Sequence, residues 1–143
     1  MVNIANLISR MQKLTYFARL APEDIAKIIR NGSITEHSEH EMIVEEGRTC
    51  AGLFVLLSGE IYLKKISPEG QYHTLYVLSP VNMFNEVSVL DHGENPASAF
   101  TGKDSVIWRI EQDKILNIIE MNPSLPMGLL TMTAYPPYHY TFT

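Results

Sequence analysis

The sequence is almost free of cysteine. Cys50 is the only one among 143 residues, which excludes an intrachain disulfide, a four-cysteine zinc site and an iron–sulfur cluster held by the cysteines of one chain. A neighbouring cation such as Arg48 can lower the pKa of a thiol and make it redox-sensitive. No histidine or second cysteine stands beside Cys50, so the sequence favours an ordinary small residue in a turn.

Positive charge is also scarce. The chain has 11 Lys and Arg against 16 Asp and Glu, for a formal net charge of −5, and Lys64-Lys65 is the only adjacent basic pair. Proteins that bind nucleic acids obtain most of their affinity by neutralising phosphates with a basic surface. We therefore expect no direct DNA binding by this chain alone.

Long hydrophobic runs are absent as well. No window approaches the roughly 20 consecutive apolar residues of a membrane span, and Arg10 and Lys13 interrupt the apolar positions near the start of the chain. The sequence predicts a cytoplasmic protein without a membrane partner. It also contains no nucleophile elbow, Walker loop or dinucleotide fingerprint, so we expect no catalytic residues and no enzyme activity.

Hydrophobic residues make up 45% of the chain and charged residues 19%, enough apolar material for one domain with a buried core. We expect this domain to cover residues 1–135. Residues 136–143 follow Tyr135, include Pro136-Pro137 and have no helical period, so they are predicted to form an irregular tail.

Helices are predicted at both ends of the domain. Apolar residues recur at helical spacing from Ile4 to Leu14, and a second helix is expected to start at Pro22 and stop at Asn31-Gly32. A third helix is predicted after the charged turn at residues 111–114 and ends at Asn122-Pro123. A short helix over residues 126–134 would be cut off by the proline pair.

Between these helical segments the chain consists of short strand-like runs separated by turn residues. Many short strands with closely spaced turns indicate a sandwich or roll. The expected fold is therefore mainly β with flanking α-helices. The predicted runs are residues 33–37, 42–44, 53–57, 60–66, 72–78, 97–101 and 106–110.

Three segments stand out in the β-rich part of the chain. They are Glu46-Gly47 with LFVLLSGEIYL (residues 53–63), FNEVSVLD (residues 84–91), and NPASA (residues 95–99) with DSVIWRI (residues 104–110). Together they resemble the cyclic-nucleotide-binding domain, in the variant found in Crp/Fnr-like transcriptional regulators. The resemblance covers roughly residues 14–130 and implies a double-stranded β-helix (jelly roll) that serves as the N-terminal effector domain of such a regulator.

The resemblance also implies a ligand site. In the family a glycine-containing segment, the phosphate-binding cassette, offers backbone N–H groups to a phosphate; residues 84–91 stand at its place here and are called the cassette below. A glutamate of the family accepts a hydrogen bond from the ribose hydroxyl, and an arginine contacts the phosphate. Glu86 matches the family glutamate. The implied ligand-binding residues are Phe84, Asn85, Glu86, Val87, Pro96, Ala97 and Ser98.

The chain departs from the family pattern at two points. Asn85 stands where the family has glycine, and Asn95-Pro96-Ala97 stands where the arginine is expected. Loss of a buried partner of a charged group costs several kcal/mol, or roughly 100-fold in affinity. The sequence therefore predicts that cAMP is not bound in the usual way. The expected effector is a cyclic nucleotide or another small anionic molecule, whose identity the sequence does not name.

Each departing or matching residue has a second interpretation. Glu86 is either a ligand contact or a cap of the cassette helix. Asn85 replaces glycine by tolerating a left-handed backbone. Ser98 either donates to a ligand or bonds to the backbone around it.

The histidines raise the alternative of a metal or haem site. His37 and His40 lie among glutamates, and jelly rolls include cupin metalloenzymes, but the cupin His-x-His pattern is missing, so a solvated acidic loop is the favoured interpretation. His73 is either a haem ligand, as in some gas-sensing relatives, or an ordinary strand residue; the second is favoured. We expect no bound metal.

Three functions follow, in decreasing order of support. The first is the small-molecule-sensing domain of a transcriptional regulator, with a homodimer formed through the C-terminal helix. The second is a ligand-free dimerisation or docking module, which the missing arginine favours and the retained Glu86 disfavours. The third is a cupin-like metalloenzyme. A stand-alone sensor, a truncated gene product and a fragment of a longer regulator all fit the sequence.

Overall fold

The structure is a computed structural model that describes residues 3–14, 17–18, 20–85, 89 and 93–121. The expected mainly-β fold with flanking helices is confirmed. In chain order the elements are α1 (Ile4–Met11), α2 (Pro22–Arg30), β1 (Ser33–His37), β2 (Met42–Val44), β3 (Gly52–Ile66), β4 (Tyr72–Leu78), β5 (Asn82–Phe84), β6 (Ser98–Glu111) and α4 (Gln112–Met121).

The two N-terminal helices form where the sequence predicts them. Asn3 caps α1, since its side chain accepts a hydrogen bond from the backbone of the first turn, and Leu7 and Met11 form the buried face. Pro22 occupies the first turn of α2 and Asn31 its C-cap. Both predicted boundaries of α2 are therefore confirmed.

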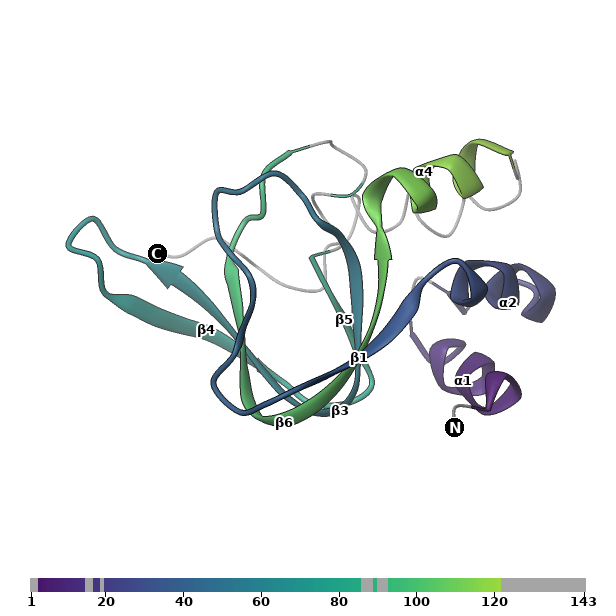
Figure 1. Ribbon diagram of the computed structural model, residues 1–143, viewed down its shortest axis with the longest axis horizontal. Helices are drawn as coiled ribbons and strands as arrows, with labels where there is room; N and C mark the ends of the chain where they lie inside the picture. Colours follow the sequence, from purple (N-terminus) through teal and green to yellow (C-terminus); the bar gives the residue numbers. More distant parts are fainter. Residues whose placement is uncertain (1–2, 15–16, 19, 86–88, 90–92, 122–143) are drawn as a thin grey trace.

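The strands form one antiparallel sheet that curls into a roll. The order along its main path is β1-β6-β3-β4, with β2 paired to β6 and β5 paired to β3. α1, α2 and α4 lie together on one side of the roll, and the β3–β4 hairpin projects on the opposite side (Figure 1). None of the described helices is long and apolar enough to cross a membrane.

The prediction that β3 and β6 are each two short strands is wrong. Both strands run through the glycines that the sequence interpretation placed in turns, Gly59 and Gly102. At Gly59 the backbone is left-handed, with φ +101°, and the pairing of β3 with β6 shifts register between Leu56 and Ile61. The glycine therefore makes a bulge that bends a continuous strand. β5 was not predicted.

The core has two parts. One lies between the helices and the roll and includes Phe17, Ile25 and Trp108; the other lies inside the roll and includes Phe84 and Ile107. The side chain of Trp108 is fully buried. The predicted third helix is present as α4. The predicted short helix at residues 126–134, the tail at 136–143 and the dimer helix lie outside the described residues.

Candidate ligand-binding site

The structure brings four of the predicted site residues together. Phe84 ends β5 and Asn85 follows it, while Pro96 and Ala97 lie just before β6. The four line one narrow hollow, which leaves no room for a water molecule between them. Glu86 and Val87, the other predicted cassette residues, lie outside the described residues.

Asn85 takes the conformation that glycine adopts most easily. Its φ is +67°, so the interpretation that asparagine replaces glycine by tolerating a left-handed backbone is confirmed. The side chain is buried and its Nδ2 donates to the Gly52 carbonyl at 2.9 Å and to Oδ1 of Asn95 at 3.1 Å. Asn85 thus ties the start of the cassette to the start of β3.

Asn95 begins the Asn95-Pro96-Ala97 stretch, which stands where the resemblance places the arginine. Its Nδ2 donates to the Glu45 carbonyl at 2.9 Å, and its backbone N–H donates to the Arg48 carbonyl at 2.8 Å. The side chain is 4% exposed. Asn95 therefore holds the turn at residues 45–48 against the cassette, and the stretch that it begins carries no positive charge.

Ser98 takes the second of its two predicted roles. Its Oγ accepts a hydrogen bond from the backbone N–H of Glu46 at 2.9 Å, and the residue is 1% exposed. Ser98 is not among the residues that line the hollow. Its hydroxyl proton stays available for donation, but the described contact is to the backbone, so Ser98 positions Glu46.

Lys65 is a site residue that sequence reasoning missed. Its ammonium lies 3.1 Å from the Pro96 carbonyl and 3.2 Å from Oε2 of Glu46. The other carboxylate oxygen of Glu46 accepts from the backbone of Ile66 at 3.0 Å. No sequence signal links Lys65 to Pro96, because the folding of β3 beside β6 creates the contact. A cation therefore reaches the edge of the site, already paired with a carboxylate.

The cassette contacts the helix that follows the roll. Val89 is fully buried, and its carbonyl accepts a hydrogen bond from Nε2 of Gln112, the first residue of α4, at 3.1 Å. Val89 also packs in the same apolar cluster as Ile115 and Ile118 of α4. A displacement of the cassette would therefore directly disturb its contacts with α4.

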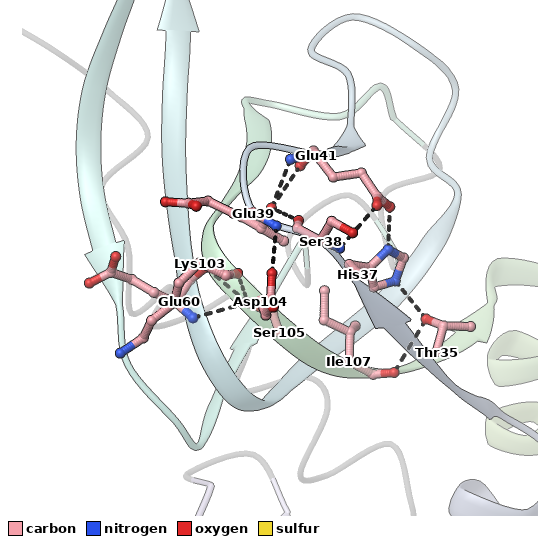
Figure 2. Close-up of polar contacts among 11 residues, drawn as sticks. Thr35, His37, Ser38, Glu39, Glu41, Glu60, Lys103, Asp104, Ser105 and Ile107 are labelled. Atoms are coloured by element: carbon pink, nitrogen blue, oxygen red, sulfur yellow. Dashed lines mark hydrogen bonds and ion pairs between the residues drawn. The ribbon is translucent and has the colours of Figure 1, made fainter.

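The alternative sites receive little support from the described residues. Cys50 is buried, while the side chain of Arg48 is 75% exposed and paired with Glu45. His37 contacts the carboxylate of Glu41, as Figure 2 shows. Within the described part of the chain no group of three or more His, Cys, Asp or Glu side chains is placed to hold a metal ion.

Comparison with known proteins agrees with this architecture. The family model of the cyclic nucleotide-binding domain matches residues 34–122. The cyclic AMP receptor protein of Thermus thermophilus is 28% identical over 118 residues, which cover 82% of this chain and 55% of the relative. This chain thus spans about half the length of the curated relatives it matches.

Solved structures show the same fold. The catabolite activator protein of Thermus thermophilus superimposes with a TM-score of 0.75 at 28% identity, covering 84% of this chain and 56% of that chain. The sensor domain of the transcriptional regulator DNR from Pseudomonas aeruginosa gives a TM-score of 0.79 at 20% identity, covering 92% of this chain and 88% of that chain. By fold, by motif and by the extent of the family match, the chain belongs to the cyclic nucleotide-binding domain family.

Proposed function

We propose that this chain is the small-molecule-sensing regulatory domain of a Crp/Fnr-type transcriptional regulator, and that it does not bind cAMP in the usual way. The family match and the names of the relatives support a sensing domain of a regulator. The proposed ligand residues are Phe84, Asn85, Glu86, Val87, Pro96, Ala97 and Ser98. The domain works in the cytoplasm, is not an enzyme, and does not bind DNA by itself.

The proposal that the chain does not bind cAMP in the usual way rests on the environment of Asn95. A phosphate anion buried in this site needs a charge-assisted partner, and such contacts are about twice as strong as neutral ones. Asn95 offers a neutral amide whose Nδ2 already donates a hydrogen bond to the Glu45 carbonyl. Lys65, the described cation nearest to Pro96, is already paired with Glu46. The proposed effector, a cyclic nucleotide or another small anion, would therefore have to be held by contacts other than the usual arginine.

Signalling follows from the contact between the cassette and α4. An effector that prefers one arrangement of the cassette shifts the population toward it. The hydrogen bond from Gln112 to the Val89 carbonyl transmits that shift to α4. In the proposed homodimer the chain beyond α4 forms the subunit contact, so a change in α4 alters how two subunits pair.

Calorimetric titration with cAMP and cGMP tests the proposal, using the wild type, Asn95→Arg and Pro96→Arg. We expect no heat from the wild type at roughly 1 mM nucleotide, and measurable binding when either variant restores an arginine. Two variants are used because Asn95→Arg also removes buried hydrogen bonds. Thermal melting of each variant shows whether it is folded.

Two results would contradict the proposal. Micromolar binding of cAMP by the wild type, lost in Glu86→Ala, would make the chain an ordinary cyclic-nucleotide sensor. Binding by neither folded arginine variant would favour the alternative function, a ligand-free dimerisation or docking module. The narrow hollow, which has no room for a water molecule, is the observation that supports this alternative.

A further inference from the structure

A second hollow lies away from the cassette, between α1 and the floor of the roll. It has a volume of about 300 Å³, and α1 contributes Asn3, Asn6 and Arg10 to its wall. Arg10 is one turn beyond the buried Leu7, so the helix directs the guanidinium toward β3, where it donates to the Leu57 carbonyl. The position of the guanidinium is thus fixed by packing of the helix.

Arg10 has no carboxylate partner among the described residues. The ion pairs found there involve other cations, namely His37, His40, Arg48 and Lys65. A guanidinium carries five N–H donors, and among the described residues Arg10 has one acceptor, the Leu57 carbonyl. Arg10 lines the hollow together with Asn3 and Asn6. This end of the hollow suits a carboxylate.

An adjoining hollow has the opposite charge. It has a volume of about 470 Å³, shares Ser58 and Val106 with the first hollow, and is lined by Glu36, Glu41 and Asp104. Figure 2 shows how Glu41 and Asp104 lie. Glu41 is held by His37, and Asp104 accepts from the backbone of Glu39 at 3.0 Å.

Glu36 is the carboxylate of this hollow for which the described residues provide neither a hydrogen bond nor an ion pair. The double hollow, called the rim groove from here on, therefore has an unpaired cation at one end and an unpaired anion at the other. A charged group gains most from a ligand when no protein group already neutralises it.

The strand register sets the length of the rim groove. Glu36 of β1 lies opposite Val106 of β6, and Val106 lies opposite Ser58 of β3. Neighbouring strands are about 4.8 Å apart, so Glu36 and Ser58 are separated by about 10 Å across the floor. Arg10 reaches the carbonyl of Leu57, next to Ser58. A chain of two or three residues spans about 7–10 Å, which is comparable with the backbone separation of the two strands at the ends of the groove.

We propose that the rim groove binds a short zwitterionic, peptide-like molecule, with its carboxylate at Arg10 and its ammonium at Glu36 and Asp104. The opposite charges at the two ends set the orientation of the ligand. Ser58 and Val106 form the floor between them. The site is separate from the cassette, so it does not depend on the proposed effector pocket.

Titration with triglycine, followed by ¹⁵N NMR of the full chain, tests this proposal. We expect the amides of Leu57, Ser58 and Val106 to shift, with saturation at roughly 10 mM peptide for a millimolar site. N-acetyl-triglycine and triglycine amide each lack one charge. Each should bind at least about 10-fold more weakly, because one charge-assisted contact is lost.

Matched variants assign the two ends. Arg10→Gln and Glu36→Gln should each weaken triglycine binding at least about 10-fold, whereas Arg30→Gln and Glu69→Gln, which make the same changes outside the groove, should leave it unchanged. Glu36 is exposed, so Glu36→Gln keeps the test valid even if Arg10→Gln unfolds the chain. Absence of shifts at saturating peptide, or equal binding by the capped peptides, would overturn the proposal.

Discussion

Nδ2 of Asn85 lies 3.1 Å from Oδ1 of Asn95 and donates a hydrogen bond to it. Both residues are 4% exposed, and each is also bonded to a backbone carbonyl, that of Gly52 for Asn85 and that of Glu45 for Asn95. A buried polar group that loses its partner costs about 1–3 kcal/mol. This pair of amides therefore joins three segments that are distant in sequence, and it does so at the site where the family pattern calls for glycine and arginine.

Substitution of Asn85 separates its side-chain bonds from its backbone conformation. Asn85→Gly removes the side-chain hydrogen bonds but adopts the left-handed backbone without strain, so we expect a loss of about 2 kcal/mol in the free energy of unfolding. Asn85→Ala removes the same bonds and adds left-handed strain, for a further loss of about 1 kcal/mol. Urea denaturation measures both values. If the alanine variant were as stable as the glycine variant, the left-handed backbone at residue 85 would not strain an alanine, and this prediction would be wrong.

Much of the strand pattern could be predicted from the sequence because strand ends coincide with ordinary turn residues. β1, β2 and β4 have the predicted bounds. The long strands β3 and β6 were divided in error because a glycine in a bulge and a glycine in a turn look alike in one sequence. Only the pairing of Ser58 and Glu60 with β6 shows that Gly59 lies in a bulge within one continuous strand.

The candidate site was predictable to a lesser degree. The motif placed Phe84, Asn85, Pro96 and Ala97 together, and the structure shows them around one hollow. Lys65 was not predictable, because a contact between a lysine of β3 and the Pro96 carbonyl depends on tertiary packing.

The bulge in β3 gives a second prediction, from two glycines that share a left-handed backbone. A Cβ on Gly59 would lie 2.1 Å from Oγ and 2.6 Å from Cα of Ser105, whereas a Cβ on Gly70 would meet nothing within 4 Å. Gly59→Ala should therefore cost about 3 kcal/mol, from strain and overpacking together, and Gly70→Ala about 1 kcal/mol, from strain alone. Chemical denaturation of the two variants gives the comparison, and equal losses would show that crowding at Ser105 is relieved.

The third prediction concerns acid stability. The hydrogen bond from the His37 side chain, with a second from the backbone of Ser38, holds the pKa of the Glu41 carboxyl below its ordinary value of 4.5. A group whose pKa is lower in the folded state stabilises the fold above its unfolded pKa and loses this contribution as the pH falls through its folded pKa. The contribution of Glu41 is therefore present above pH 4.5 and lost below it.

Glu41→Gln measures that contribution. The stability difference between wild type and Glu41→Gln should be largest above about pH 4.5 and should shrink as the pH falls through the lowered pKa of the wild-type carboxyl, which then becomes protonated. Urea denaturation across this range checks it, with Glu69→Gln in the hairpin turn as the control. A difference that stays constant with pH would show that Glu41 acts through packing and not through its charge.

The last prediction tests the link between the cassette and α4. Nε2 of Gln112 donates to the Val89 carbonyl at 3.1 Å, so Gln112→Ala leaves that buried carbonyl without this donor and should destabilise the docking of α4 by about 1 kcal/mol. Hydrogen exchange of the α4 amides should accelerate about 5-fold if α4 opens locally. Glu120→Ala alters an exposed side chain on the same helix and should leave the exchange unchanged. If Gln112→Ala also left it unchanged, Ile115 and Ile118 alone would hold α4 to the roll, and the cassette would have to signal through apolar packing.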